Sequence, residues 1–306
     1  MEDIKKGFVE AYGDNFSTKE YITDPAIGRE KEIKELILIL LTPDKSAILT
    51  GKPGIGKTAI VEGLAYQIHK GNVPDALKDY TIVKIDTQAL IGVEKNTGDS
   101  RVLTLVTELK EKNKFIVFID EIHTLIGSKD QGALDFANMF KTALGRGDVK
   151  LIGATTTDEY ERYILRDKAF LRRFEKVSVS EPTREQAIKI LVGTIPKIEH
   201  QTGAKLGYTA FIHEKISAFL VDVTKEYNRV YENQSRYPDV ALTMLRQAFS
   251  NAVFENQDTV LLRHVRQAIL NSKAIYDDIK RKESTRFNKE FKDLLDKEEP
   301  KEEEVI

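Results

Sequence analysis

One loop, the eight residues at 51–58, constrains this chain more than any other segment. It reads Gly-Lys-Pro-Gly-Ile-Gly-Lys-Thr, which matches the phosphate-binding pattern G-x-x-x-x-G-K-[ST]. The apolar run at 47–50 before it is typical of a buried strand, and the apolar spacing at 59–66 after it is typical of an amphipathic helix. A flexible turn that matches the pattern by chance would not be expected to have both a buried strand before it and an amphipathic helix after it. The loop therefore predicts an α/β fold that binds a nucleotide.

The residue types in this loop suit a triphosphate. Backbone N–H groups must turn inward around the phosphates, and glycine carries no side chain that would block them. We expect Lys57 to reach the β- and γ-phosphates and Thr58 to hold Mg²⁺ through its hydroxyl, while the new helix adds its positive dipole end. The predicted nucleotide-binding residues of the loop are Gly51, Pro53, Gly54, Ile55, Gly56, Lys57 and Thr58.

Composition argues against several kinds of partner. With 47 Lys+Arg against 49 Asp+Glu, the chain has no basic excess, which lowers the expectation of a nucleic-acid partner. It has no cysteine, hence neither disulfides nor thiolate metal sites, as fits a reducing cytosol. Residues 1–6 are too polar for a signal peptide, and the apolar run at 36–41 is too short to span a bilayer. We expect a cytoplasmic protein with no nucleic-acid partner and no membrane partner.

Strand-like segments alternate with helix-length stretches through the first two-thirds of the chain. The segments are short and apolar or β-branched, which predicts a parallel five-stranded sheet sandwiched by helices. They comprise residues 47–50, 80–85, 115–119, 151–154 and 175–179. In such a sheet, ligands bind at the carboxyl ends of the strands.

Beyond Thr183 the predicted strands stop and helical periodicity follows. Thr183 and Gln186 form a capping-box pattern at the first of four helical segments, which are 184–198, 211–227, 240–254 and 261–275. We therefore expect a large nucleotide-binding domain at 1–182, a small helical lid domain at 183–276 and a charged C-terminal helix or tail at 277–306. The charged end suits a helix that frays into a solvated tail, or alternatively an acidic protein-binding segment.

Two acids follow the predicted strand at 115–119. Alone, Asp120 and Glu121 would suit a helix cap, but an upstream phosphate loop favours a chemical role. Asp120 is then expected to hold Mg²⁺ and its waters, and Glu121 to orient and deprotonate the attacking water. His123 lies close by, but no second His or Cys stands at ligand spacing, so we expect a structural role for it.

Six segments occur in an order that resembles the first ATPase module of Clp-type AAA+ chaperones. The segments are residues 24–30, 51–58, 118–127, 153–156, 158–160 and 172–177. The similarity is good over about residues 20–200 and looser over the helical domain. It implies a P-loop AAA+ fold, Mg²⁺-dependent ATP hydrolysis, a homo-hexameric ring and a protein client or adaptor.

The resemblance also implies roles for individual residues. Ile27 and Gly28 would lie beside adenine, and Asp239 belongs to a stretch that closes over the nucleotide, although it would equally suit a plain helix cap. Thr156, expected at the end of the fourth strand, would be the first sensor of the γ-phosphate; alternatively, its hydroxyl is satisfied by backbone groups.

Two consecutive arginines follow in the same resemblance. Arg172 and Arg173 would act as arginine fingers in the neighbouring subunit's ATP site; alternatively, they are solvated cations at a helix end. Arginine fingers contribute about 10³–10⁵ in rate, so a finger in trans would make hydrolysis depend on assembly. With these two, the predicted catalytic residues are Glu121, Thr156, Arg172 and Arg173.

One segment departs from the Clp-type pattern. The stretch 91–99 matches the loop that grips substrate in the central pore, but Asn96 stands where an aromatic residue is expected. Two functions therefore compete: an ATP-driven protein-remodelling machine, and an ATP-dependent switch or scaffold that binds a partner without threading it. A DNA-acting loader is a weaker third hypothesis, because the sequence has no basic stripe and no convincing helix-turn-helix.

Overall fold

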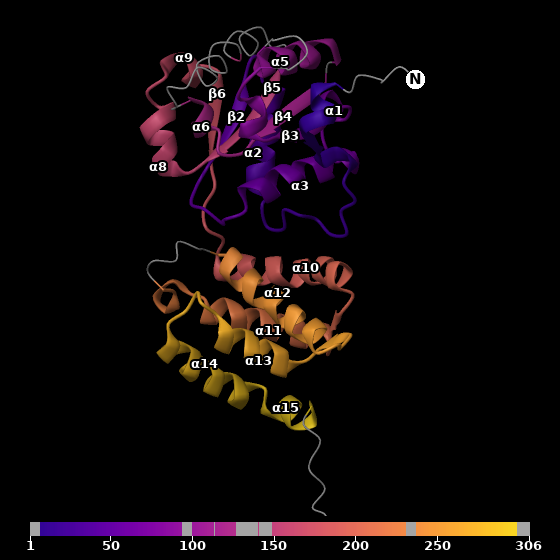
Figure 1. The fold of residues 1–306 in the computed structure, drawn as a ribbon, viewed down its shortest axis with the longest axis vertical. Coiled ribbons are helices and arrows are strands. Elements are labelled where there is room, and N and C mark those ends of the chain that lie inside the picture. Colours follow the sequence, from indigo (N-terminus) through magenta and orange to yellow (C-terminus); the bar gives the residue numbers. More distant parts are fainter. Residues whose placement is uncertain are drawn as a thin grey trace, which may run out of the picture. The chain divides into compact units, whose positions relative to one another are not determined.

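The structure is a computed structural model that describes residues 7–93, 100–112, 114–126, 140, 149–230 and 237–298 (Figure 1). It separates into two compact units. The first comprises Met1–Lys52 and Gly56–Ser180, and the second comprises Pro53–Ile55 and Glu181–Ile306. No helix among the described residues is both long enough and apolar enough to cross a membrane.

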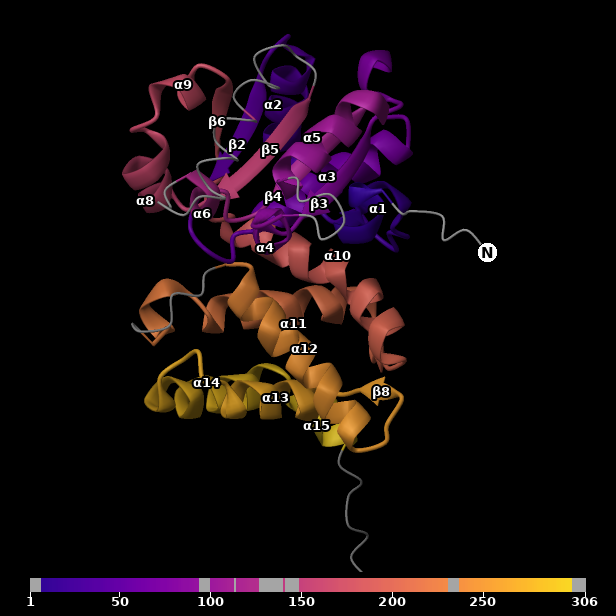
Figure 2. The ribbon, with the colours of Figure 1, turned by 45° about the horizontal axis from the view of Figure 1, so that its top comes forward.

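The first unit is built on a six-stranded sheet, whose order is β1-β3-β4-β5-β2-β6 (Figure 2). Its strands are β1 (Gly13–Asn15), β2 (Ser46–Thr50), β3 (Thr81–Ile85), β4 (Phe115–Ile119), β5 (Lys150–Thr155) and β6 (Phe174–Ser178). The last five pair in parallel and confirm the predicted five-stranded sheet. The sequence did not predict β1, a short strand that adds to β3 in antiparallel orientation.

Burial explains why the parallel strands form. All five residues of β2 are buried, as are four of the five in β4, so each strand is a nearly continuous apolar run. The register pairs Thr50 with Thr155 on one side and with Ser178 on the other, so the carboxyl ends of β2, β5 and β6 meet at one edge of the sheet. This edge receives the phosphate loop, because residue 51 directly follows β2.

Helices flank this sheet. They are α1 (Phe8–Tyr12), α2 (Glu30–Leu41), α3 (Lys57–His69), α4 (Thr87–Leu90), α5 (Arg101–Lys112), α6 (His123–Ile126), α8 (Thr157–Glu159) and α9 (Lys168–Leu171). Helix α2 packs on α3 and on β2, whereas α1 packs on α5 and on β3. A Cβ at Gly63 in α3 would lie 2.2 Å from the Cβ of Ala26, so only glycine lets the 24–28 turn approach α3 this closely.

The second unit is helical and has its own core. Its helices are α10 (Arg184–Thr202), α11 (Ala210–Val223), α12 (Asp239–Phe254), α13 (Leu262–Asn271), α14 (Asp277–Glu290) and α15 (Lys292–Glu298), with a two-stranded ribbon of β7 (Lys205–Leu206) and β8 (Thr259–Val260). The capping box of Thr183 and Gln186 forms as predicted at the start of α10.

The charged segment expected at 277–306 is described as far as residue 298, and a solvated tail beyond that point stays a prediction. It is helical to Glu298, and Phe287, Phe291 and Leu295 are buried in the same core as α10–α13. These three residues recur at intervals of four, which places them on one face of the α14–α15 segment. Most charged residues of the segment are exposed, but Glu283, four residues before Phe287, is buried on the same face and pairs with Arg286 at 2.7 Å.

Candidate active site

The phosphate loop begins where β2 ends and closes at the first turn of α3. Gly54 and Gly56 both have left-handed backbones, with φ of 74° and 95°, and Gly56 is the N-cap of α3. A residue with a Cβ would be strained in this conformation, so the two glycines allow the tight turn. Ile55 between them is buried and anchors the loop.

Lys57 turns back into this loop. Its side chain is buried, and Nζ donates to the carbonyl oxygens of Gly51 at 2.9 Å and of Lys52 at 3.1 Å. Burial lowers the pKa of Lys57, against the opposing influence of nearby carboxylates, of which Asp120 is the strongest. An ammonium group held inside a glycine-rich turn fits a polyphosphate, because a phosphate oxygen would relieve the cost of burying the charge.

Thr58 and Asp120 come together from different strands. The Thr58 hydroxyl donates to Oδ2 of Asp120 at 3.1 Å. Thr58 follows β2, Asp120 follows β4, and β5 lies between those two strands in the sheet. A hydroxyl and a carboxylate oxygen at this distance are the hard ligands that Mg²⁺ prefers, so the pair fits the predicted metal role.

Glu121 occupies the turn after β4 in an uncommon backbone conformation. Its φ is 52°, in the left-handed region, which costs a non-glycine residue about 1–3 kcal/mol. Its N–H donates to Oδ1 of Asp120 at 3.0 Å. Burial raises the pKa of Glu121, and the charges of Glu159 and Asp120 raise it further. A carboxylate of raised pKa beside the predicted metal ligands Thr58 and Asp120 fits the predicted role of a general base.

Thr156 directly follows β5, which ends at Thr155, so it lies at the end of this strand as predicted. Thr156 is also the N-cap of α8, where its hydroxyl accepts from the N–H of Glu159 at 3.2 Å and donates to Oε2 of Glu159 at 2.7 Å. The hydroxyl thus takes part in a capping box. A sensor role for Thr156 stays a prediction, and it would require this hydroxyl to exchange partners.

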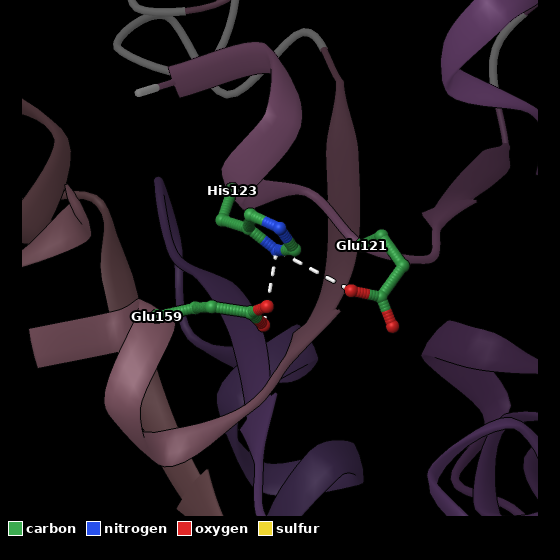
Figure 3. A group of neighbouring side chains, drawn as sticks. All are labelled: Glu121, His123 and Glu159. Atoms are coloured by element: carbon green, nitrogen blue, oxygen red, sulfur yellow. Dashed lines mark ion pairs between the residues drawn. The ribbon is translucent and has the colours of Figure 1, made fainter. Parts of the chain in front are cut away.

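A cluster beside Glu121 was missed by the sequence reasoning. Figure 3 shows His123 between two carboxylates, with Nδ1 3.4 Å from Oε2 of Glu121 and 3.2 Å from Oε2 of Glu159. One ligand atom from each residue lies within 4.8 Å of the others. The imidazole nitrogen lies within polar contact of both carboxylates, and these contacts account for the cluster without a cation. The T-x-x-E pattern of residues 156–159, typical of a capping box, is the sequence signal that could have located Glu159 here.

The predicted adenine-binding turn packs beside α3. Gly28 has φ of 72°, and the N–H of Arg29 donates to the carbonyl oxygen of Ala26 at 3.1 Å. Arg29 is buried, and its Nη1 donates to the carbonyl oxygen of Ser180 at 2.9 Å. The turn that carries Ile27 and Gly28 is therefore fixed to the chain just after β6. Contact of these two residues with a base stays a prediction.

Arg172 and Arg173 lie at the other edge of the sheet from the phosphate loop. The N–H of Ser46, the first residue of β2, donates to the carbonyl oxygen of Arg173 at 2.8 Å. The loop follows the last residue of the same strand, about 13 Å away at the rise of a parallel strand. Arg172 is exposed and Arg173 half-buried. The structure thus does not bring these arginines together with the chain's own phosphate loop.

Two further predicted residues remain. Asp239 lies beside the phosphate loop, since a Cβ at Gly54 would be 3.2 Å from the Cβ of Asp239, and both residues belong to the second unit. Asp239 is the first residue of α12 in the second unit and forms no side-chain cap, because Pro238 is the N-cap. Its carboxylate at a helix N-terminus suits the helix dipole, and its role at a nucleotide stays a prediction. Asn96 falls outside the described residues.

Comparison with known proteins agrees with this arrangement. Residues 47–179 match the family model of the ATPase family associated with various cellular activities (AAA). Chaperone protein ClpB of Aquifex aeolicus is 42% identical over 254 residues, which are 81% of this chain and 24% of ClpB. ClpB of Enterococcus faecalis is 46% identical over 194 residues, which are 62% of this chain and 22% of ClpB. The chain thus spans about a quarter of the length of these relatives.

Solved structures of Hsp104 are similar as well. A closed-state structure of Hsp104 with ATPγS and FITC casein superposes with a TM-score of 0.72 at 32% identity, covering 85% of this chain and 44% of Hsp104. An extended S. cerevisiae Hsp104:casein complex gives a TM-score of 0.72 at 33% identity, covering 86% and 45%. Residues 47–179 therefore form a domain of the AAA ATPase family, within a chain that is a relative of the Clp-type AAA+ chaperones.

Proposed function

We propose that this chain binds ATP with Mg²⁺ and hydrolyses the terminal phosphate bond. One observation carries the proposal: Lys57, Thr58, Asp120 and Glu121 meet at the carboxyl edge of one parallel sheet. The contact between Thr58 and Asp120 spans two strands that are not neighbours, which a chance motif would not produce. The match to the AAA family supports the same conclusion.

Each residue has a definite task in this proposal. Lys57 and the loop amides bind the phosphates, while Thr58 and Asp120 hold Mg²⁺, which neutralises charge on the phosphate oxygens. Glu121 orients a water molecule and accepts its proton as the water oxygen attacks phosphorus. The raised pKa of Glu121 favours this step, because a stronger base accepts a proton more readily.

The proposed site is completed by a second copy of the chain. Arg172 and Arg173 lie at the end of the strands opposite their own phosphate loop. Their guanidinium groups would therefore contact the nucleotide of a neighbouring copy. A ring of such copies, expected as a homo-hexamer from the Clp-type resemblance, would place each pair beside the next nucleotide. Hydrolysis would then require assembly, as in other arginine-finger enzymes.

We further propose that turnover drives the remodelling of protein clients. The support lies in the relatives: ClpB is named a chaperone, and Hsp104 structures hold casein. The chain spans about a quarter of ClpB, and the proposal for it includes a protein client or adaptor and a cytoplasmic location.

A switch or scaffold without threading is the second candidate. It is favoured by Asn96, since an amide lacks the flat apolar face that grips a moving chain. The two candidates differ in what ATP turnover achieves. Unfolding of a tagged stable reporter in the presence of ATP supports remodelling, and turnover with no unfolding at any ring concentration supports the switch.

The experiment that tests the core proposal combines binding, turnover and size. ATP binding is measured by calorimetry with Mg²⁺, phosphate release by a coupled assay, and mass in solution by light scattering with and without ATP. We expect binding, release of phosphate and growth in mass with nucleotide. A chain that binds no ATP, or that hydrolyses it at full rate as a dilute monomer, would contradict the proposal.

A further inference from the structure

Three oxygens surround one nitrogen of His123. Nδ1 lies 3.0 Å from Oγ1 of Thr155, 3.2 Å from Oε2 of Glu159 and 3.4 Å from Oε2 of Glu121. The Thr155 hydroxyl donates its hydrogen bond to Oε2 of Glu159, at 3.1 Å. All three oxygens therefore face Nδ1 as acceptors, so Nδ1 must carry a proton and the ring acts here as a donor.

Glu159 is the fixed end of this cluster. Its Oε2 accepts from the N–H of Thr156 at 3.0 Å and from the Thr156 hydroxyl at 2.7 Å. Thr156 directly follows β5, so the capping box ties the carboxylate to the end of a buried central strand. Hydrogen bonds from neutral donors to a charged acceptor are strong, and they hold Glu159 in one orientation.

His123 is held in turn from two sides. It is the first residue of α6, and its ring stacks on Tyr163 with a centroid distance of 5.9 Å and an interplanar angle of 20°. Its side chain is only 15% exposed, compared with 54% for that of Glu121. The order of the contacts runs from the sheet through Glu159 to His123 and then to Glu121 (Figure 3).

Glu121 needs such support. Its exposed side chain projects from a left-handed turn, and within the described residues the ion pair with His123 is the polar contact recorded for its carboxylate. A general base works only when it is aimed at the proton that it accepts, and an error of about 1 Å in placement costs about 10²-fold in rate.

We propose that His123 and Glu159 are positioning residues that aim the Glu121 carboxylate at the attacking water. The inference rests on the proposed function, because it assigns a support to the base of that reaction. It gives His123 a task beyond the structural role expected from the sequence. Neither residue touches the reacting atoms, so both act through Glu121.

Three substitutions separate positioning from mere folding. His123→Ala removes the donor, whereas His123→Asn keeps an N–H close to the place of Nδ1. Glu159→Gln removes the charge but keeps the capping box, since Gln also serves at that position of the box. His213→Asn, a histidine of the second unit whose Nε2 contacts the Gly207 carbonyl, is the matched control.

Steady-state turnover of the full chain with ATP and Mg²⁺ gives the first measurement. We expect His123→Ala to lower kcat about 10–100-fold with KM within about 2-fold of the parent, and His123→Asn to recover most of the loss. In a Glu121→Gln background, His123→Ala should cause no further loss, because its effect passes through Glu121. An unchanged kcat for His123→Ala, or a loss that adds fully to that of Glu121→Gln, would overturn the proposal.

Imidazole ¹⁵N NMR of the full chain gives a second measurement that needs no hydrolysis. We expect the Nδ1 resonance of His123 to move in Glu121→Gln and in Glu159→Gln, and to stay unchanged in His213→Asn. If the parent hydrolyses no ATP while these shifts appear, the proposed function fails and the His123 contacts stand. If the Nδ1 resonance ignores both carboxylates, the positioning role fails whether or not ATP is hydrolysed.

Discussion

The hydroxyl of Thr58 donates to a carboxylate oxygen of Asp120 at 3.1 Å, although the two residues are 62 positions apart in the chain. One belongs to the helix that follows β2 and the other to the turn that follows β4. The contact joins the phosphate loop to the turn that carries Asp120 and Glu121, so the residues proposed to bind the nucleotide and to activate water lie at one edge of the sheet.

Lys57→Ala should remove nucleotide binding. The ammonium group would lose its charge-assisted hydrogen bonds to two phosphates, worth about 1.5–3 kcal/mol each, which corresponds to a loss of affinity of at least about 100-fold. Calorimetric titration with ATP and Mg²⁺ measures the effect. The control is Lys70→Ala at the opposite end of α3, where the side chain is exposed. Parent-like affinity in Lys57→Ala would show that the loop does not bind the phosphates.

Glu121→Gln should bind ATP but turn it over about 10²–10⁴ times more slowly than the parent. The amide keeps the shape of the side chain and cannot take a proton from water. Binding by calorimetry and phosphate release under saturating ATP separate the two effects. A variant that hydrolyses at the parental rate would exclude Glu121 as the base.

Arg172→Ala and Arg173→Ala should each leave ATP binding intact and reduce hydrolysis. A full finger contributes about 10³–10⁵ in rate, and the residue that supplies it should show the larger loss. Mixing either variant with Glu121→Gln subunits tests action across a subunit boundary. We expect turnover in the mixture to depart from the sum of the two components. Strict additivity at every mixing ratio would place the arginines outside the shared site.

Gly63→Ala should destabilise the first unit by about 1–3 kcal/mol, the usual cost of overpacking. The added methyl would lie 2.2 Å from the Cβ of Ala26, so the 24–28 turn must move. Chemical denaturation measures the loss. The double variant Ala26→Gly/Gly63→Ala removes the opposing methyl and should recover part of it. A single variant as stable as the parent would mean that the turn is not held against α3.

His264 should make the second unit less stable in acid. The N–H of Leu261 donates to Nδ1 of His264 at 2.9 Å, so Nδ1 accepts and the buried ring is neutral, while Nε2 lies 3.1 Å from Oε2 of Glu255 and 3.3 Å from Nε of Arg263. Burial lowers the pKa of His264, although Glu255 opposes the effect. The unfolded chain then binds a proton that the folded chain does not, and stability falls with pH below about 6.5 by at most about 1.4 kcal/mol per pH unit.

Hydrogen exchange of α12 and α13 measures this dependence, after correction for the intrinsic rate at each pH. We expect less protection at pH 5.5 than at pH 7.5 in the parent, and a weaker dependence in His264→Asn. His213→Asn should keep the parental dependence. Protection that rises on acidification would contradict the neutral state of His264.

The parallel sheet could be predicted from sequence because its strands are buried on both faces. Residues such as Ile48 and Val117 therefore lie in nearly uninterrupted apolar runs. The β1 strand could not, since Gly-Asp-Asn at 13–15 carries no apolar pattern and forms only by pairing with β3. Tertiary context, rather than local propensity, decides such an edge strand.

The candidate site could likewise be predicted only in part. The proximity of Asp120 to the phosphate loop could be predicted because this residue follows a strand of the same parallel sheet and a phosphate loop lies upstream. The boundary between Thr155 and Thr156 was not predicted, because both are threonines after an apolar run and only Glu159 decides which one caps the helix. In the C-terminal segment, the high charge obscured Phe287, Phe291 and Leu295, whose spacing of four was the signal for burial.

The opposite placement of the phosphate loop and the arginine pair has a consequence for how the rate depends on protein amount. Under the proposed function, doubling the concentration of a dilute protein would more than double its rate of ATP hydrolysis. The added protein also raises the fraction of chains that are assembled and therefore share a subunit interface. A steep, greater than first-order rise in phosphate release at low protein, levelling to proportionality once assembly is complete, is the kinetic signature of this geometry.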